Sequence, residues 1–386
     1  MSQTITILGS TGSIGIATLR VIKTLNNKFV VYGLTCYNNL NLLEKQIQEF
    51  NPVAIAIGAK DLAITDKYKT LKKKYNHIEF LEGEEGIIEI STRKVNILLS
   101  AIVGAAGLKP SIAALPNIER IAIANKETLV MAGDIFIQKV KQHNVELIPV
   151  DSEHSAIFSL IENIKSSEIK RLIITASGGS LRERPINELS TITPEEALAH
   201  PTWEMGKKIT IDSATFINKG LEVIESHHLF NLDYNQIDVI IHPESIIHSM
   251  VETIDGAIHA YLSVADMALP IIKALTYPEK KENPFEWLDL ARIGSLNFYP
   301  YNNKRFPALE LCYHAGRTGG TMPTVLNAAN EIAVNAFLNK KIKFTEIVNL
   351  IERTMGKHKT INKPNLSDIF QSDQWARKIT KSLLRG

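Results

Sequence analysis

A strand pattern, a glycine-rich turn and a helix pattern follow one another within the first 25 residues, and this order constrains the fold more than any other feature. Residues 4–8 (TITIL) are rich in β-branched residues, GSTGSIG follows at 9–15, and apolar residues then recur at helical spacing. Glycine lets the backbone approach a pyrophosphate closely, and a helix N-terminus offers free N–H groups. The segment therefore predicts a dinucleotide-binding turn beginning at Gly9, in preference to a purely structural turn.

Strand and helix patterns continue to alternate up to residue 150. The further strand-like runs are VAIAIG (53–58), NILLSAIVG (96–104), RIAIANKE (120–127) and VELIPV (145–150). This rhythm predicts a parallel, doubly wound sheet, whose ligands gather at the carboxyl ends of the strands. Lys126 lies at such an end, so we expect it to be functional, although most lysines are simply solvated.

The second strand pattern, FVVYGL (29–34), ends in TCYNN (35–39). An NAD-binding domain usually carries an acidic residue there to hold the ribose 2′-hydroxyl. Tyr37, Asn38 and Asn39 include no acid, which favours NADP over NAD. They also include no Arg or Lys to hold the 2′-phosphate.

Two carboxylates, Asp151 and Glu153, follow the strand pattern 145–150. If the strand continued, both would point to one face and Ser152 to the other. Carboxylates that close repel unless a metal, a shared proton or water separates them. Aspartate and glutamate oxygens suit Mg²⁺ or Mn²⁺, which normally needs a third carboxylate, and Glu222 is the candidate.

A second polar segment, 199–230, offers the groups that a phosphate monoester needs. Ser213, Asn218 and Lys219 supply a hydroxyl, an amide and an ammonium group. On a helix, Glu222 would share a face with Asn218 and Lys219. The alternative is an ordinary surface ion pair between Lys219 and Glu222.

Two loop segments also carry polar residues. The sequence SGG beginning at Ser177 could wrap an anion with backbone N–H groups or be a flexible hairpin loop, and the residues do not favour either. His200, Trp203 and Met205 lie among Pro and Gly residues, which indicates a mobile lid.

Composition narrows the class of protein. The 386 residues predict two or three domains, and the formal net charge of +2 gives no reason to expect nucleic acid or an anionic membrane as partner. Cys36 and Cys312 lack metal-type spacing and fit a reducing compartment. We find no signal-peptide pattern and no apolar run of membrane-spanning length, so a cytoplasmic, soluble protein is expected. Four amphipathic helix patterns follow Pro307 and predict a small bundle.

Taken together, these motifs resemble the 1-deoxy-D-xylulose-5-phosphate reductoisomerase family. The matching strings, from residue 9 to about 340, are GSTGSIG, IVGAAGL, ANKE, PVDSEHSAIF, ASGG, HPTWEMGKKITIDSATFINKGLEVIE, IHPESIIHSMV and LNAANEIAVNAFL. The resemblance implies NADPH- and divalent-metal-dependent rearrangement and reduction of 1-deoxy-D-xylulose 5-phosphate to 2-C-methyl-D-erythritol 4-phosphate in the non-mevalonate isoprenoid pathway. The metal would be Mg²⁺ or Mn²⁺, with Co²⁺ as a third option.

The resemblance also implies a role for each matching residue. Metal ligands would be Asp151, Glu153 and Glu222, with Lys126 as a further catalytic residue. The cofactor would contact Gly9, Thr11, Gly12, Ser13, Ile14, Asn39, Asn125 and Glu127. The substrate would contact Lys126, Ser152, Glu153, Ser177, His200, Ser213, Asn218, Lys219 and Glu222, under a flap of His200, Trp203 and Met205. Because Ser152 would then be a substrate contact, we expect the chain to be turning there already.

The family architecture implies α/β organisation in three domains. We expect an N-terminal Rossmann-type doubly wound domain (1–150), a central α+β catalytic and dimerisation domain (151–277), a linker (278–305) and a C-terminal four-helix bundle (306–386). A homodimer is implied. Tyr37 and Asn38 depart from the family, where many members have a small and then a basic residue, so the hold on the 2′-phosphate is the weakest part of the match.

Two alternatives lie outside this family. One is a metal-independent NADP dehydrogenase of a phosphorylated substrate, in which Asp151 and Glu153 cap a helix or form salt bridges. The other is a nucleotide-sensing protein without turnover, which would leave the polar cluster from Ser213 to Glu222 without a role.

Overall fold

The protein is described here by a computed structural model that covers residues 2–25, 28–203 and 205–385. The described chain packs as two compact units, each of which draws on several segments. The first takes in Met1–Thr128, Phe136–Asp151 and Asp266–Phe285, and the second Leu129–Ile135, Ser152–Ala265 and Glu286–Gly386. The division into domains at residues 150, 277 and 305 stays a prediction, because packing density alone does not test it.

The first unit is built on a parallel sheet of seven strands. In chain order these are β1 (Gln3–Leu8), β2 (Phe29–Cys36), β3 (Ala54–Ile57), β4 (Glu79–Glu82), β5 (Val95–Ser100), β6 (Ile118–Ile123) and β7 (Glu146–Pro149). They lie in the order β4-β3-β2-β1-β5-β6-β7, and every pair is parallel. The predicted Rossmann-type sheet is confirmed.

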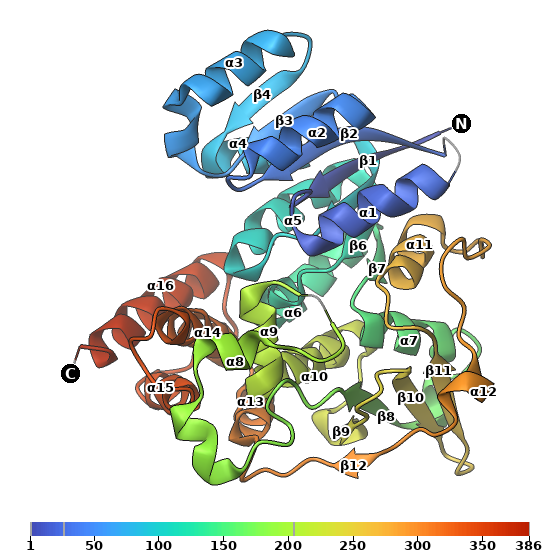
Figure 1. The fold of residues 1–386 in the computed structure, drawn as a ribbon, viewed down its shortest axis with the longest axis vertical. Coiled ribbons are helices and arrows are strands. Elements are labelled where there is room, and N and C mark those ends of the chain that lie inside the picture. Colours follow the sequence, from blue (N-terminus) through green and yellow to red (C-terminus); the bar gives the residue numbers. More distant parts are fainter. Residues whose placement is uncertain (1, 26–27, 204, 386) are drawn as a thin grey trace. The chain divides into compact units, whose positions relative to one another are not determined.

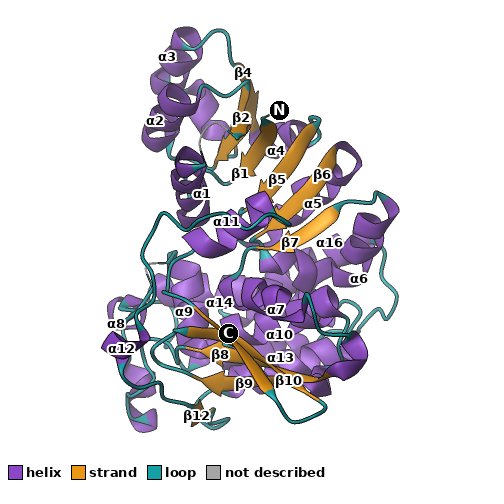
Figure 2. Cartoon of the chain, turned by 90° about the vertical axis from the view of Figure 1, so that its right-hand side faces the viewer, coloured by secondary structure: helices purple, strands orange, loops and turns teal. Residues whose placement is uncertain are grey.

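The helices of this unit cover both faces of the sheet. They are α1 (Ser13–Thr24), α2 (Leu40–Phe50), α3 (Asp66–Lys74), α4 (Gly83–Ser91), α5 (Leu108–Ala114) and α11 (Ala268–Thr276). The helix α6 (Lys126–Gln142) belongs to this unit except for Leu129–Ile135, which the second unit includes. Since crossovers between parallel strands are right-handed, α1 and α2 lie on one face while α4 and α5 lie on the other (Figure 2). Central strands are then buried on both faces, which explains why Ile5, Ile7 and Leu98 are fully buried.

The position of β1 determines where a ligand can bind. Its neighbours are β2 on one side and β5 on the other, so the chain leaves the sheet's centre in opposite directions. In doubly wound sheets this switch point opens a crevice at the carboxyl ends of the strands. Gly9, the first residue after β1, lies at that end.

The second unit contains a mixed sheet of five strands. These are β8 (Ile169–Ala176), β9 (Ile237–Ile241), β10 (Ile247–Thr253), β11 (Ile258–Leu262) and β12 (Tyr299–Pro300), in the order β11-β10-β8-β9-β12. Among the described strands of this sheet, β8 and β9 pair in parallel, and the other pairs are antiparallel. The associated helices are α7 (Ser152–Ile161), α8 (Pro194–Leu198), α9 (Lys207–Thr215), α10 (Ile217–Phe230) and α12 (Leu290–Ile293).

Four helices complete the second unit, as the sequence predicts. They are α13 (Pro307–Thr318), α14 (Met322–Leu338), α15 (Glu346–Met355) and α16 (Leu366–Leu383), and they lie together at the C-terminal end of the chain (Figure 1). The small residues of α14, Ala328, Ala329 and Ala333, are fully buried against α9, α13, α15 and α16. None of the described helices is long and apolar enough to cross a membrane.

Candidate active site

The chain bends sharply between β7 and α7. The strand ends at Pro149 and the helix begins at Ser152, so Glu153 lies in the first helical turn. The extended arrangement, with Asp151 and Glu153 on one strand face, is therefore wrong, and the expected turn at Ser152 is confirmed. Acidic residues favour a helix N-terminus because they complement its dipole, which accounts for the change of structure at this point.

A second sharp bend separates α9 from α10. Phe216 adopts a left-handed backbone conformation with φ of 69°, which is strained for a bulky residue. Its ring is buried and stacks on Phe306 with 3.9 Å between centroids, and this packing stabilises the bend. The bend places Asn218 and Lys219 in the first turn of α10, and the predicted helix through Glu222 is confirmed.

The three predicted metal ligands lie close together. Oxygen atoms of Asp151, Glu153 and Glu222 all lie within 4.8 Å of one another. Asp151 directly precedes α7, so the local chain brings it to Glu153, whereas Glu222 reaches the group from α10. Glu222 is buried and the other two are partly buried. The cluster thus brings three hard oxygen donors to one point.

Two lysines lie among these carboxylates. Lys219 Nζ is 2.6 Å from Glu153 Oε1 and 2.5 Å from Glu222 Oε2, and Lys126 Nζ is 2.5 Å from Asp151 Oδ2. Burial lowers the pKa of Lys219, but Glu153 and Glu222 outweigh burial and hold that pKa above its ordinary value. Three carboxylates against two ammonium groups leave the cluster with a net negative charge that favours a further cation.

Neutral groups complete the hydrogen bonding of the cluster. Asn218 Nδ2 donates to Glu222 Oε1 at 2.5 Å, and Ser152 Oγ donates to Glu153 Oε2 at 2.5 Å. Asn218 and Ser152 are both predicted substrate contacts. Their side chains therefore orient the carboxylates of Glu222 and Glu153.

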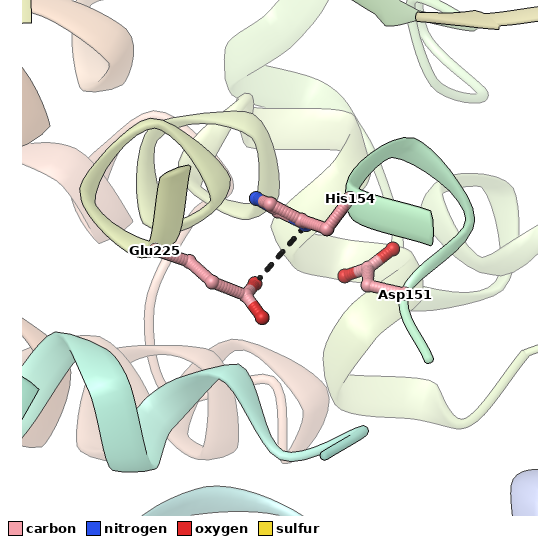
Figure 3. A group of neighbouring side chains, drawn as sticks. All are labelled: Asp151, His154 and Glu225. Atoms are coloured by element: carbon pink, nitrogen blue, oxygen red, sulfur yellow. Dashed lines mark ion pairs between the residues drawn. The ribbon is translucent and has the colours of Figure 1, made fainter. Parts of the chain in front are cut away.

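Behind this cluster lies a buried pair that the sequence analysis did not identify, His154 and Glu225. Figure 3 shows the His154 ring between Glu225 and Asp151, with Nδ1 3.4 Å from Glu225 Oε2. The other ring nitrogen, Nε2, lies 3.0 Å from the backbone oxygen of Glu222 and 2.9 Å from Ser226 Oγ. His154 on α7 thus bonds directly to the backbone of a metal-ligand candidate on α10. Glu225 follows Glu222 by three residues, a spacing that could have indicated its place on the same helix face.

The Ser177 loop packs against the C-terminal end of α9. Gly178 and Gly179 have φ of 89° and 71°, and a Cβ on Gly179 would lie 2.8 Å from the backbone oxygen of Ser213. Gly179 N donates to Ser177 Oγ at 3.2 Å. The geometry brings Ser177 toward Ser213, and only glycine permits this close approach.

His200, the first residue of the predicted flap, has hydrogen-bond partners at both ring nitrogens. His200 Nδ1 accepts hydrogen bonds from the backbone N–H groups of Thr202 and Trp203 at 3.2 and 3.0 Å, and Nε2 lies 3.1 Å from Ser177 Oγ. Burial, and secondarily the charge of Arg182, lowers the pKa of His200. The ring is therefore neutral at pH 7, as two N–H donors on Nδ1 require.

Another flap residue, Trp203, contacts an aromatic ring. Trp203 meets the ring of His248 edge-on with 6.3 Å between centroids, and Met205 is partly buried. Residue 204 lies outside the described part of the chain.

Hydrogen bonds between buried Ser10 and Gln46 fix the glycine turn after β1. Gly9 has φ of 86°, and a Cβ there would lie 2.7 Å from the backbone oxygen of Ala101. Ser10 Oγ donates to Gln46 Oε1 at 2.8 Å, and Gln46 Nε2 donates back to the Ser10 carbonyl at 2.8 Å. Gln46 reaches the turn from α2 and was not among the predicted site residues.

The start of α1 is open to a ligand. Gly12 precedes the helix and makes no side-chain cap, and the first turn carries no acid. Gly12 and Ser13 are exposed, and Thr11 and Ile14 are partly so. Free N–H groups at this end suit a pyrophosphate.

The remaining predicted cofactor contacts, Asn39, Asn125 and Glu127, lie at the starts of helices. Asn125 Oδ1 accepts from Thr128 N at 3.0 Å at the start of α6, and its Nδ2 donates to Glu127 Oε2 at 2.9 Å. Asn39 Oδ1 accepts from Leu42 N at 3.1 Å at the start of α2. Both helix starts lie at carboxyl ends of strands, where the fold binds ligands.

Three family models match almost the whole chain. The model of 1-deoxy-D-xylulose 5-phosphate reductoisomerase matches residues 5–133, and the model of the C-terminal domain of that enzyme matches 147–230. A third, the DXP reductoisomerase C-terminal domain, matches 262–379.

Relatives and solved structures agree with these matches. The 1-deoxy-D-xylulose 5-phosphate reductoisomerases of Pelodictyon phaeoclathratiforme and a Synechococcus strain are 48% and 46% identical over 383 residues, which is 99% of this chain and 100% and 97% of theirs. The Zymomonas mobilis enzyme in complex with NADPH is 39% identical with a TM-score of 0.92 and full coverage of both chains. A DOX-P reductoisomerase in complex with NADPH, fosmidomycin and magnesium is 39% identical, with a TM-score of 0.91 over 99% of this chain and 98% of that one.

Proposed function

The chain belongs to the 1-deoxy-D-xylulose 5-phosphate reductoisomerase family, and from this premise we propose that Asp151, Glu153 and Glu222 hold the divalent cation of its reaction. The activity is the NADPH-dependent rearrangement and reduction of 1-deoxy-D-xylulose 5-phosphate to 2-C-methyl-D-erythritol 4-phosphate in the non-mevalonate isoprenoid pathway. The single observation that carries the metal assignment is the convergence of the three carboxylates within 4.8 Å.

The donor set fits Mg²⁺ or Mn²⁺. Carboxylate oxygens are the hard ligands that these ions prefer, and three of them leave positions for substrate oxygens or water. When bound, the ion supplies Lewis-acid polarisation of the substrate's carbonyl oxygen. Asp151, Glu153 and Glu222 would hold that ion, and His154 Nε2 lies 3.0 Å from the Glu222 backbone oxygen, which fixes the position of this ligand.

Lys126 and Lys219 are the two positively charged side chains at the carboxylate cluster. Lys126 is buried at the first turn of α6 and paired with Asp151, where its ammonium group stabilises oxyanion charge or moves a proton. Lys219 neutralises Glu153 and Glu222 before the cation enters. With a divalent cation bound, Lys219 would no longer be needed to neutralise these carboxylates, and its ammonium group would be able to bind the substrate phosphate.

The phosphate site is proposed at Ser177, Ser213, Asn218 and Lys219. Gly179 lies against the backbone of Ser213, so the Ser177 loop and the end of α9 border the same space. Hydroxyl, amide and ammonium donors suit a phosphate monoester. The binding energy of this distal group orients the reacting end and helps His200, Trp203 and Met205 to close.

The cofactor site is proposed at the turn Gly9, Thr11, Gly12, Ser13 and Ile14, with Asn39, Asn125 and Glu127 at neighbouring strand ends. NADPH supplies the hydride of the reduction. The backbone N–H groups of the turn and of the first turn of α1 hold the pyrophosphate, and Gln46 keeps Ser10 in place beneath it.

A homodimer is proposed for the assembled enzyme. Exposed large apolar side chains occur in the second unit, and such residues are enriched at interfaces: Ile254, Ile258, Trp287, Leu290, Phe298 and Tyr299. Light scattering after size-exclusion chromatography tests the assignment.

We place the enzyme in the cytoplasm, since its buried Cys36 and Cys312 are both free thiols.

The function is tested by incubating the purified chain with deoxyxylulose phosphate, NADPH and Mg²⁺ or Mn²⁺ and identifying the product by NMR. Methylerythritol phosphate is expected, and excess chelator should stop both turnover and NADPH oxidation. NADPH oxidation that chelator leaves unchanged would favour a metal-independent dehydrogenase. Cofactor binding with no product would favour a nucleotide-sensing protein.

A further inference from the structure

The carboxyl end of β2 lacks the charge that a 2′-phosphate needs. In a Rossmann domain the adenosine ribose lies at this strand end. Tyr37, Asn38 and Asn39 follow the strand, are all exposed and carry no charge. Asn39 also uses its side-chain oxygen to cap α2. A cation that binds the 2′-phosphate must therefore come from another segment.

Helix α3 brings lysines to α2, which begins directly after these residues. Lys74 Nζ lies 2.7 Å from Glu44 Oε1 at one end of the contact. Two helical turns earlier on the same face of α3, Lys67 Nζ donates to Asn41 Oδ1 in the first turn of α2. Asn41 lies two residues beyond Asn39, so Lys67 places an ammonium group beside the strand end that lacks charge.

The position of α3 is held by a buried residue next to Lys67. Tyr68 is 2% exposed, its hydroxyl donates to Glu82 Oε1 at 2.8 Å, and its ring packs edge-on against Phe80. Thr65 Oγ1 caps the helix by accepting from Tyr68 N at 3.3 Å. Because Tyr68 is anchored in this way, the backbone of α3 is fixed at the point from which the Lys67 side chain reaches Asn41.

Lys67 differs in charge balance from Lys60 and Lys74, the lysines on either side of it that pair with carboxylates. Lys60 pairs with Glu85 at 2.8 Å, and Lys74 pairs with Glu44. Among the described residues, no carboxylate lies within 4.0 Å of Lys67 Nζ, whose partner Asn41 is a neutral amide. A cation near a helix N-terminus opposes the helix dipole, so local stability does not account for a lysine there. A bound anion does.

We propose that Lys67 binds the 2′-phosphate of NADPH and is the residue that makes this chain prefer NADPH to NADH. Asn38 and Asn41 would add amide hydrogen bonds to the same phosphate. Lys67 thus replaces, from a separate helix, the basic residue absent after β2. The proposal rests on the proposed cofactor site at Gly9–Ile14.

Direct binding tests the proposal. Dissociation constants for NADPH, NADH and adenosine 2′,5′-bisphosphate are measured by calorimetry on the full chain and on Lys67→Met, Lys67→Arg and Lys60→Met. Since a charge-assisted contact is lost, Lys67→Met should bind NADPH and the bisphosphate about 10- to 100-fold more weakly, with NADH unchanged. Lys67→Arg should retain the preference. Lys60→Met, which removes a nearby but paired lysine, should bind all three ligands like the original chain.

Three results would overturn the proposal. An unchanged ratio of NADPH to NADH affinity in Lys67→Met would remove Lys67 from the site while leaving the cofactor site intact. Equal weakening of both dinucleotides would indicate a general electrostatic effect. If the original chain bound neither dinucleotide, the cofactor site itself would be refuted, and the Lys67 assignment with it. Because Lys67 is exposed, thermal melting should show that Lys67→Met folds normally.

Discussion

Lys219 Nζ lies 2.6 Å from Glu153 Oε1, and this ion pair joins the first turn of α10 to the first turn of α7. The same ammonium group lies 2.5 Å from Glu222 Oε2. A lysine thus occupies the space between two carboxylates that are expected to bind a divalent cation. The lysine and the cation cannot both neutralise the same oxygens, so their competition can be measured.

Replacing Lys219 with Met should destabilise the metal-free protein and make it unusually responsive to metal. Removing one partner of a buried pair costs about 3–5 kcal/mol, because Glu153 and Glu222 are left facing each other. Mg²⁺ would restore the missing charge and stabilise by binding only the folded state. Thermal melting with and without Mg²⁺ should show a larger Mg²⁺-induced rise in Tm for the variant than for the original chain.

Lys208→Met is the matched control for that experiment. Lys208 pairs with the buried Asp212 at 2.8 Å, outside the proposed metal site. This variant should also lose stability, but Mg²⁺ should raise its Tm only as much as that of the original chain. Equal Mg²⁺ responses in all three proteins would separate Lys219 from the metal site.

Glu222→Gln should reduce turnover severely while leaving NADPH binding nearly intact. The amide keeps the shape of the side chain but removes a charged ligand, and each tenfold loss in rate corresponds to about 1.4 kcal/mol of lost transition-state stabilisation. A loss of roughly 100-fold or more in kcat is expected from several kcal/mol of metal-derived stabilisation. Steady-state kinetics and NADPH titration provide the two measurements, with the exposed Glu352→Gln as control. Full activity of Glu222→Gln would remove this residue from the site.

Acid should weaken the flap through His200. Its folded-state pKa is lowered by burial, so the neutral ring's contacts are fully present above about pH 6.5, the ordinary value, and are lost as pH falls through the lowered pKa. Protonation of Nδ1 would oppose the N–H groups of Thr202 and Trp203. The KM for the substrate should therefore rise in acid while NADPH affinity changes little.

His200→Asn tests the origin of that pH dependence. An asparagine oxygen can accept the same N–H groups but does not titrate, so the additional acid-side rise in KM should disappear. Ionisation of the substrate phosphate affects both proteins equally. Identical pH profiles would assign the rise to the substrate.

Gly9 and Gly12 should respond differently to alanine. At Gly9 the backbone is left-handed, which costs about 1–2 kcal/mol for other residues, and a Cβ would lie 2.7 Å from the Ala101 oxygen. At Gly12 a Cβ would meet the Gly9 oxygen at an ordinary 3.4 Å. Gly9→Ala should lower the Tm, whereas Gly12→Ala should keep its Tm but bind NADPH more weakly. Equal Tm values for the two variants would contradict this distinction.

Gln46→Leu should weaken NADPH binding without altering the metal or substrate sites. The change leaves the Ser10 carbonyl buried without the amide that bonds it, at a cost of about 1–3 kcal/mol. We expect a raised KM for NADPH and an unchanged kcat at saturating cofactor. The exposed Gln48→Leu on the same helix is the control. A lowered kcat with an unchanged KM would contradict a role for Gln46 in holding the turn.

Local patterns in the sequence were enough to predict many elements. The turn at Gly9 and the helix containing Asn218 and Glu222 depend on backbone preferences and side-chain periodicity within a few residues, so they can be read directly. The four C-terminal helices follow from the same periodicity. Extending the strand pattern through Glu153 failed, because alternation of two acids cannot distinguish a strand end from a helix start.

Pairings across elements depended on the tertiary structure. Lys219 meets Glu153 across 66 positions, and Gln46 meets Ser10 across 36. Nothing in the spacing of such residues identifies a partner, since the pairing is set by how α7 packs on α10 or α2 on the sheet. For the same reason, the sequence after β2 contains no basic residue and predicted no ligand for the 2′-phosphate. The packing of α3 beside α2 brings Lys67 to Asn41, close to the end of β2. Chain-local chemistry therefore specified the elements and the types of ligand, and long-range packing decided which charged groups share one space.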